Sequence, residues 1–264
     1  MKFITRVIIQ IGIILGFIGT IVVNTLSSLG MINGFTPEDL SDAIPNLFVP
    51  SGLTFAVWGV IYLGLLALTI YSTIALFKKK EEKVYFLNKM GIEFIIASLA
   101  NIAWIFLWHY QFVALSLIAM VVLLGSLITM YLRLKIGKSD SDMKEKLLIH
   151  IPVSLYLGWI TIATVANATA LLVDVGWNRF GLTEVYWTNF MLIIATIITL
   201  LMLLLRKDLA YSLVVIWAFS GIILKRYQVS PPLELEVVAT GVIGIGLITI
   251  MIGFTVFRIL KKKS

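Results

Sequence analysis

The chain has 264 residues, of which 60% are hydrophobic and only 13% charged, and its mean hydropathy is +1.02. Soluble domains average about 45–50% apolar and about 25% charged residues, so this chain has too little polar surface to cover a water-soluble globule. It contains no cysteine and only two histidines, which excludes disulfides and thiolate chemistry and argues against a protein-bound metal ion. We expect neither a metal nor a resident cofactor.

A helix needs about 20 apolar residues to cross the hydrocarbon core of a bilayer, and eight such stretches follow one another along the chain. The first is long and lacks a clean cleavage site, so we expect a retained helix rather than a signal peptide. The third and fourth are separated by three residues and must form an antiparallel hairpin. The predicted spans cover residues 7–27, 53–77, 88–108, 112–132, 148–172, 186–205, 209–224 and 236–258. The sequence therefore predicts an all-α, polytopic membrane helical bundle.

The positions of the basic residues predict how this bundle is oriented. If the N-terminus is cytoplasmic, 18 of the 21 lysines and arginines lie in inner segments, which leaves three outside: Arg179, Lys225 and Arg226. Such an excess is typical of cytoplasmic segments, so we expect eight spans with both termini cytoplasmic. The basic clusters at the helix ends explain the net charge of +7 as contacts with lipid headgroups, and nucleic acid is not an expected partner.

The predicted outer loop 28–52 is the longest on its side and is rich in proline and acidic residues. It contains Pro37, Glu38, Asp39, Asp42, Pro45 and Pro50. This composition argues against another span and is consistent with either an ordered lid or a solvated connector.

Three spans carry stripes of aromatic, polar and small residues at helical spacing. They are Phe55, Trp58 and Tyr62 in the second span, Asn101, Trp104 and Trp108 in the third, and Trp159, Ala163 and Asn167 in the fifth. If the stripes converge, they form an apolar pocket with a few hydrogen-bonding groups, as expected of a small-molecule site. The alternatives are aromatic core packing and, for the two asparagines, interhelical hydrogen bonds.

Glycines predict close helix packing, and the usual enzyme motifs are missing. Gly12, Gly16 and Gly19 form one face that admits a neighbouring helix closely, either within the chain or in a homodimer. The sequence contains no phosphate-binding loop, zinc-binding helix or nucleophile elbow. We therefore assign no catalytic residues.

Three of these segments resemble the tryptophan-rich sensory protein family (TspO/MBR, the translocator protein group). Residues 50–62 (PSGLTFAVWGVIY) resemble its second-helix signature. Residues 101–104 (NIAW) are similar to its third-helix N-x-x-W, and residues 159–167 (WITIATVAN) to its fifth-helix W-x-x-x-A-T-x-x-N. The resemblance covers about residues 1–172, the five-helix unit of that family, and residues 173–264 add a three-helix transmembrane segment.

The resemblance implies a receptor or sensor that binds planar hydrophobic molecules such as tetrapyrroles beneath the loop between the first two helices. By resemblance, loop 28–52 is the lid, and the residues of the three stripes line or support the pocket; Trp108 is added from its spacing alone. The other functions considered are transport of a small hydrophobic molecule and enzymatic modification of a porphyrin. The expected location is a prokaryotic cell membrane.

Overall fold

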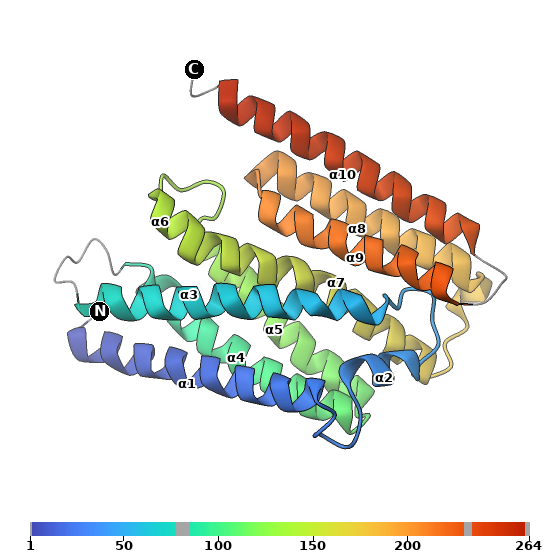
Figure 1. Cartoon of the computed structure of the whole chain (residues 1–264), viewed down its shortest axis with the longest axis horizontal. Coiled ribbons are helices and arrows are strands. Elements are labelled where there is room, and N and C mark those ends of the chain that lie inside the picture. Colours follow the sequence, from blue (N-terminus) through green and yellow to red (C-terminus); the bar gives the residue numbers. More distant parts are fainter. Residues whose placement is uncertain (1, 78–84, 230–233, 262–264) are drawn as a thin grey trace.

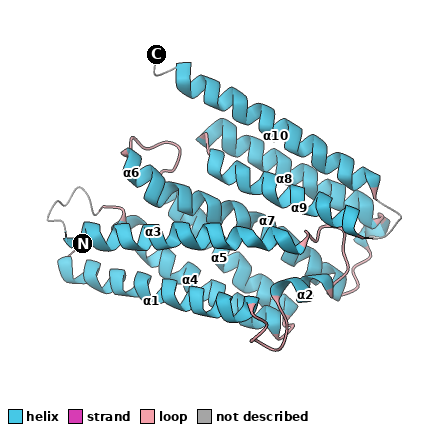
Figure 2. Ribbon diagram, in the orientation of Figure 1, coloured by secondary structure: helices cyan, strands magenta, loops and turns pink. Residues whose placement is uncertain are grey.

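The computed structural model describes residues 2–77, 85–229 and 234–261, and this part of the chain consists of helices and loops without strands (Figure 2). Eight of the described helical segments are long and apolar enough to cross a membrane. Their helices are α1 (Phe3–Ser28), α3 (Val57–Phe77), α4 (Leu87–His109), α5 (Val113–Arg133), α7 (Ile151–Asp174), α8 (Glu184–Arg206), α9 (Leu209–Gln228) and α10 (Leu235–Lys261). The predicted polytopic all-α bundle is confirmed.

Short helical pieces adjoin the spans. A 3₁₀ helix, η1 (Gly52–Ala56), leads directly into α3. The short α6 (Met143–Glu145) and the π-helical turn η3 (Lys146–His150) lead into α7. Pro152 in the first turn of α7 explains the wider turn, because its ring has no N–H and crowds the carbonyl four residues earlier. The fifth span therefore begins several residues before the predicted residue 148.

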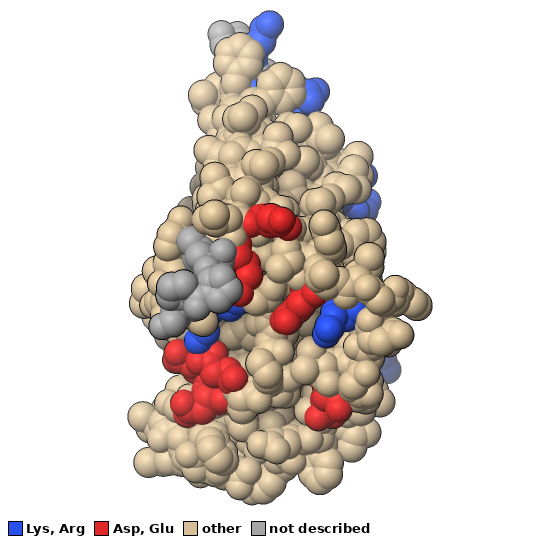
Figure 3. Space-filling model, turned by 90° about the vertical axis from the view of Figure 1, so that its right-hand side faces the viewer, with Lys and Arg blue, Asp and Glu red and all other residues tan. Residues whose placement is uncertain are grey.

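The two ends of the bundle differ in their charge. Both termini lie at the same end (Figure 1), which we call the terminal end. The other end, the lid end, includes α2 (Pro37–Asp42) and η4 (Arg179–Gly181). Viewed from the lid end, acidic side chains are prominent and basic ones few (Figure 3). This asymmetry agrees with the uneven distribution of lysine and arginine along the sequence.

Helix α7 is the centre of the bundle. Of the 18 consecutive residues that represent its span, 61% are buried, the highest share among the eight spans. Helix α7 contacts α3, α5 and α9. Gly158 allows the close approach of α9, because a Cβ there would lie 3.0 Å from the Tyr211 carbonyl oxygen and 3.2 Å from the Val214 Cβ. Side chains on several faces of α7 can therefore take part in one internal site.

The glycine face of α1 packs inside the chain. A Cβ atom at Gly12 would lie 2.6 Å from Ile95, and one at Gly16 would lie 3.0 Å from Ser98. Gly19 faces Ile102 in the same way. The glycines thus let α1 lie close against α4, and they carry no argument for a homodimer.

The last three helices pack as a group beside the first five (Figure 1). Helix α10 contacts α8 and α9, with Gly244 lying against Thr196 and Phe219. The group joins the rest of the chain mainly through α9, which contacts α7 and η1. Helix α9 is therefore the member of this group closest to the aromatic stripes.

Candidate functional site

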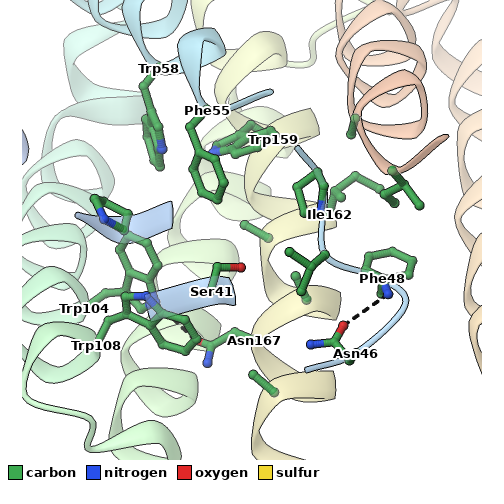
Figure 4. Close-up of a pocket in the computed structure, with 18 residues that line it drawn as sticks. Ser41, Asn46, Phe48, Phe55, Trp58, Trp104, Trp108, Trp159, Ile162 and Asn167 are labelled. Atoms are coloured by element: carbon green, nitrogen blue, oxygen red, sulfur yellow. Dashed lines mark hydrogen bonds between the residues drawn. The ribbon is translucent and has the colours of Figure 1, made fainter. Parts of the chain in front are cut away.

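A pocket lies at the lid end, between the helices and the segment 29–51, which we call the lid. The space between its walls is about 720 Å³ when the part open to solvent is included, and about 60 Å³ of it has room for the centre of a water molecule. Its walls come from the lid, η1, α3, α4, α7 and α9 (Figure 4). The lining residues are Pro37, Ser41, Asn46, Phe48, Val49, Pro50, Phe55, Trp58, Trp104, Trp108, Trp159, Ile162, Ala163, Ala166, Asn167, Ala170, Ala218 and Ile222.

Aromatic rings make up two parts of the wall. The Trp58 and Trp159 ring centroids are 6.1 Å apart at an interplanar angle of 79°, and Phe55 meets Trp159 at 6.0 Å and 78°. Trp104 and Trp108 instead lie nearly parallel, 6.3 Å apart at 20°. In Figure 4, Trp104 and Trp108 lie at one side of the pocket, away from Asn46 and Phe48 of the lid. Their broad faces offer stacking surfaces to a flat ligand.

Asn167 is the main polar group in the wall, and it also orients Trp104. The Trp104 indole N–H donates to Asn167 Oδ1 at 3.1 Å, and Asn167 Nδ2 donates to the Ser116 hydroxyl at 3.0 Å. Ser116 in turn donates to the Val113 carbonyl at 2.8 Å. This chain of hydrogen bonds joins α4, α5 and α7, and it satisfies buried polar groups that would otherwise be costly in an apolar interior.

Two of the predicted site residues, Tyr62 and Asn101, do not line this pocket. The Tyr62 ring stacks on Trp58 at 5.3 Å and 17°, so it supports the wall from outside the cavity. Asn101 is fully buried, and its Oδ1 accepts a hydrogen bond of 2.7 Å from Asn24 of α1. The interhelical hydrogen bond, one of the two alternatives for Asn101, is thus the one that the structure contains.

Seven of the nine predicted residues therefore share one cavity: Phe55, Trp58, Trp104, Trp108, Trp159, Ala163 and Asn167. The three stripes converge because α3 and α5 both contact α7 and α4 packs against α5. The comparison with protein-family models matches residues 10–254 to the family described as TSPO-like protein.

The chain belongs to the TSPO-like family. No curated protein and no solved structure matches it. The family match extends through all eight long helices and includes α8, α9 and most of α10. Together with the eight apolar helices, it identifies the chain as an integral membrane protein.

The pocket of this TSPO-like protein contains residues that the motifs did not identify. Ile162 and Ala170 extend the predicted α7 stripe, which includes Ala166 beside Asn167, and the small residues at this spacing were a detectable signal. Ala218 and Ile222 of α9 also line the cavity, but nothing in the sequence of α9 distinguishes them from ordinary packing residues.

The lid covers the pocket as an ordered segment. Thr36 caps α2, accepting from the Asp39 N–H at 3.2 Å while the Asp39 carboxylate accepts from the Thr36 N–H at 2.8 Å. The Thr36 hydroxyl and N–H bonds hold the pKa of Asp39 below its usual value. Further along, Asn46 Oδ1 accepts from the Phe48 N–H at 3.1 Å (Figure 4), and Phe48 is almost fully buried. Of the two alternatives for loop 28–52, the structure has the ordered one.

A serine–histidine pair lies away from the pocket. The Ser27 hydroxyl is 3.0 Å from His109 Nε2, and His109 Nδ1 lies 2.8 Å from the Ile105 carbonyl. Because a carbonyl only accepts, Nδ1 donates and Ser27 donates to Nε2. Both side chains are fully buried and neither lines the pocket. Because Ser27 belongs to α1 and His109 to α4, their hydrogen bond joins these two helices.

Proposed function

We propose that this TSPO-like protein is a membrane receptor or sensor that binds a planar hydrophobic small molecule of the tetrapyrrole kind. The observation that carries the proposal is the convergence of Trp58, Trp104, Trp108 and Trp159, from three helices, on one cavity under the lid. Aromatic walls favour flat, polarisable ligands, because offset stacking and edge-to-face contacts both need broad rings.

The cavity has few polar groups, which supports a ligand whose enclosed surface is mainly apolar. Asn167, Asn46 and Ser41 contribute side-chain polar groups to the lining, and the amide of Asn167 is already bonded to Trp104 and Ser116. A site with an apolar body and a small number of positioned polar groups is the usual form of a small-molecule pocket. Burial of the ligand's apolar surface would supply most of the affinity.

Titration of the detergent-solubilised protein with protoporphyrin IX tests the proposal through tryptophan fluorescence. We expect saturable quenching in the wild type, because four of the seven tryptophans line the cavity. The double variant Trp58→Ala/Trp159→Ala should bind at least about tenfold more weakly, which corresponds to the loss of about 1.4 kcal/mol or more.

The matched control is Trp177→Ala. Trp177 packs edge-on against Trp187 at 4.7 Å and does not line the pocket, so its removal should leave the porphyrin affinity unchanged. Equal affinities in the wild type and the Trp58→Ala/Trp159→Ala variant would contradict the proposed site. The absence of saturable quenching in the wild type would contradict the ligand class.

The two alternative functions have less support. A transporter of this size is expected to contain interrupted helices near the middle of the membrane, whereas η1 and the π-helical η3 lie at the starts of their spans. Gradient-dependent accumulation of a substrate in proteoliposomes would favour transport. Loss of porphyrin absorbance under light, only in the presence of the protein, would favour a porphyrin-modifying enzyme.

A further inference from the structure

We propose that α9 controls the pocket, by positioning η1 and by holding the lid closed through Lys225. This inference deepens the proposed function, on which it rests for the ligand, and assigns a role to helices that lie outside the five-helix resemblance. The evidence is a set of contacts that α9 and its neighbour α8 make with the lid and with η1. The lid contains Phe48 and η1 contains Phe55, and both residues line the pocket.

Helix α9 is docked on η1 through its backbone and one tryptophan. The Ser51 N–H donates to the Gly221 carbonyl at 3.0 Å, and the Trp217 indole N–H donates to the Thr54 carbonyl at 2.8 Å. A Cβ atom at Gly221 would lie only 1.9 Å from the Thr54 hydroxyl oxygen, so the close approach depends on glycine. Phe55 follows Thr54 directly, and its position in the wall is therefore set by this contact.

The same helix supplies part of the cavity wall. Ala218 and Ile222 line the pocket and are almost fully buried, at 1% and 2% exposure. They lie on the same face of α9 as Gly221 and Lys225, at helical spacings of three and four residues. One face of α9 thus contacts η1, the cavity and the lid.

Charged groups from α8 and α9 bind the lid directly. The Lys225 ammonium lies 2.7 and 2.8 Å from the two carboxylate oxygens of Asp42, at the end of α2. Glu184, at the start of α8, accepts from the Leu47 N–H at 2.7 Å. Together with the Ser51–Gly221 bond, these contacts hold three points of the lid against the last three helices. On the side of the first five helices, Asn33 Nδ2 donates to the His109 carbonyl at 2.8 Å, and no ion pair among the described residues joins the lid to them.

Other charges near Lys225 do not replace this contact. Arg226 and Glu234 line the same surface groove as Asp42 and Lys225, and Arg226 Nη1 is 3.7 Å from Glu234 Oε2. Arg226 is almost fully buried and no described ion pair joins it to the lid, whereas the side chain of Asp42 is 39% exposed. The Lys225–Asp42 pair is therefore the contact that can break when the lid moves outward.

Thiol labelling tests the inference without any ligand. The chain has no cysteine, so Ala170→Cys gives a single thiol, on α7 beneath the lid, where Ala170 is 4% exposed. The reaction rate with a water-soluble methanethiosulfonate reports how often the pocket opens. We expect Lys225→Met and Asp42→Asn each to raise this rate about two- to fivefold, the range of a partly exposed ion pair, and the double variant to add nothing further.

Two comparisons make the result specific. Salt should raise the labelling rate of the Ala170→Cys parent and should have no effect once Lys225 is replaced, because screening acts on the same pair. The control Lys261→Met, in the last turn of α10 at the terminal end, should leave the rate unchanged. An unchanged rate in both Lys225→Met and Asp42→Asn at low salt would overturn the role of the lid contact.

Gly221→Ala tests the positioning of η1. We expect a folded protein by circular dichroism and gel filtration, faster labelling of Ala170→Cys, and several-fold weaker porphyrin quenching. Normal labelling and quenching in this variant would show that α9 does not position the wall. If no variant binds porphyrin but Lys225→Met still accelerates labelling, the proposed ligand is wrong and the control by α9 stands.

Discussion

At the residue scale, the two asparagines that the sequence pairs as site candidates have different partners. Asn101 bonds to Asn24 on the side of α4 that faces α1, whereas Asn167 bonds to Trp104 in the pocket wall. Both residues follow the same rule, that a polar group in a membrane span needs a partner. The rule predicts their burial, but it cannot tell which neighbour supplies the partner.

Substitution by leucine should separate the two roles. We expect Asn101→Leu to destabilise the protein by about 0.6 kcal/mol and at most about 1.7 kcal/mol, the range of interhelical hydrogen bonds in membranes, and to leave porphyrin quenching intact. Asn167→Leu should cost a similar amount and also weaken quenching, because Trp104 loses its acceptor. Unfolding in mixed micelles and the fluorescence titration measure both quantities. Weaker quenching in Asn101→Leu would contradict this separation and would mean that Asn101 contributes to porphyrin binding.

The position of Tyr62 shows what helical spacing can and cannot predict about a site residue. Its position four residues after Trp58 correctly places both rings on one face of α3, where they stack. Trp58 lines the cavity, however, whereas Tyr62 does not. Helical spacing gives the face of a helix, while the depth of a residue along that face depends on the neighbouring helices.

At the scale of elements, hydropathy and length were sufficient to locate the spans. Each predicted span overlaps one of the eight segments, because an apolar run of about 20 residues has few other stable states. The exceptions have local causes: the π-helical turn before Pro152 arises from a missing backbone donor, and α9 continues to Gln228 although it becomes polar after Leu224. The docking of α9 on η1 could not be predicted, since it depends on long-range packing.

The glycine face of α1 allows a quantitative prediction at this scale. Gly16→Leu should destabilise the protein by about 1–3 kcal/mol, because added carbon atoms must displace Ser98 and α4. The matched control is Gly246→Leu on α10, where a Cβ atom would meet nothing within 4 Å. Micellar unfolding measures both variants. If the glycine face instead served a homodimer, Gly16→Leu would change the oligomeric state and leave the stability of the subunit unaffected.

At the scale of the whole molecule, the eight spans among the described residues are an even number and place both termini at one end, and the distribution of charge predicts which side that end faces. The described acidic residues of the lid, of the end of α7 (Asp174), of the start of α8 (Glu184) and of the start of α10 are concentrated at the lid end (Figure 3). Lysine and arginine dominate the connections at the terminal end. Because basic segments remain in the cytoplasm during insertion, we expect the lid and its pocket to face outward.

Single cysteines in this cysteine-free chain provide the measurement. Phe180→Cys lies in η4 at the lid end, where the native side chain is 80% exposed, and Asp140→Cys lies in an exposed position of the connection between α5 and α6. In intact cells an impermeant maleimide should label Phe180→Cys, and it should label Asp140→Cys only after permeabilisation. The reverse pattern would mean that the pocket opens toward the cytoplasm, so a ligand would have to be made or imported before it could reach the lid. The orientation thus decides whether this TSPO-like protein samples molecules outside the cell or within it.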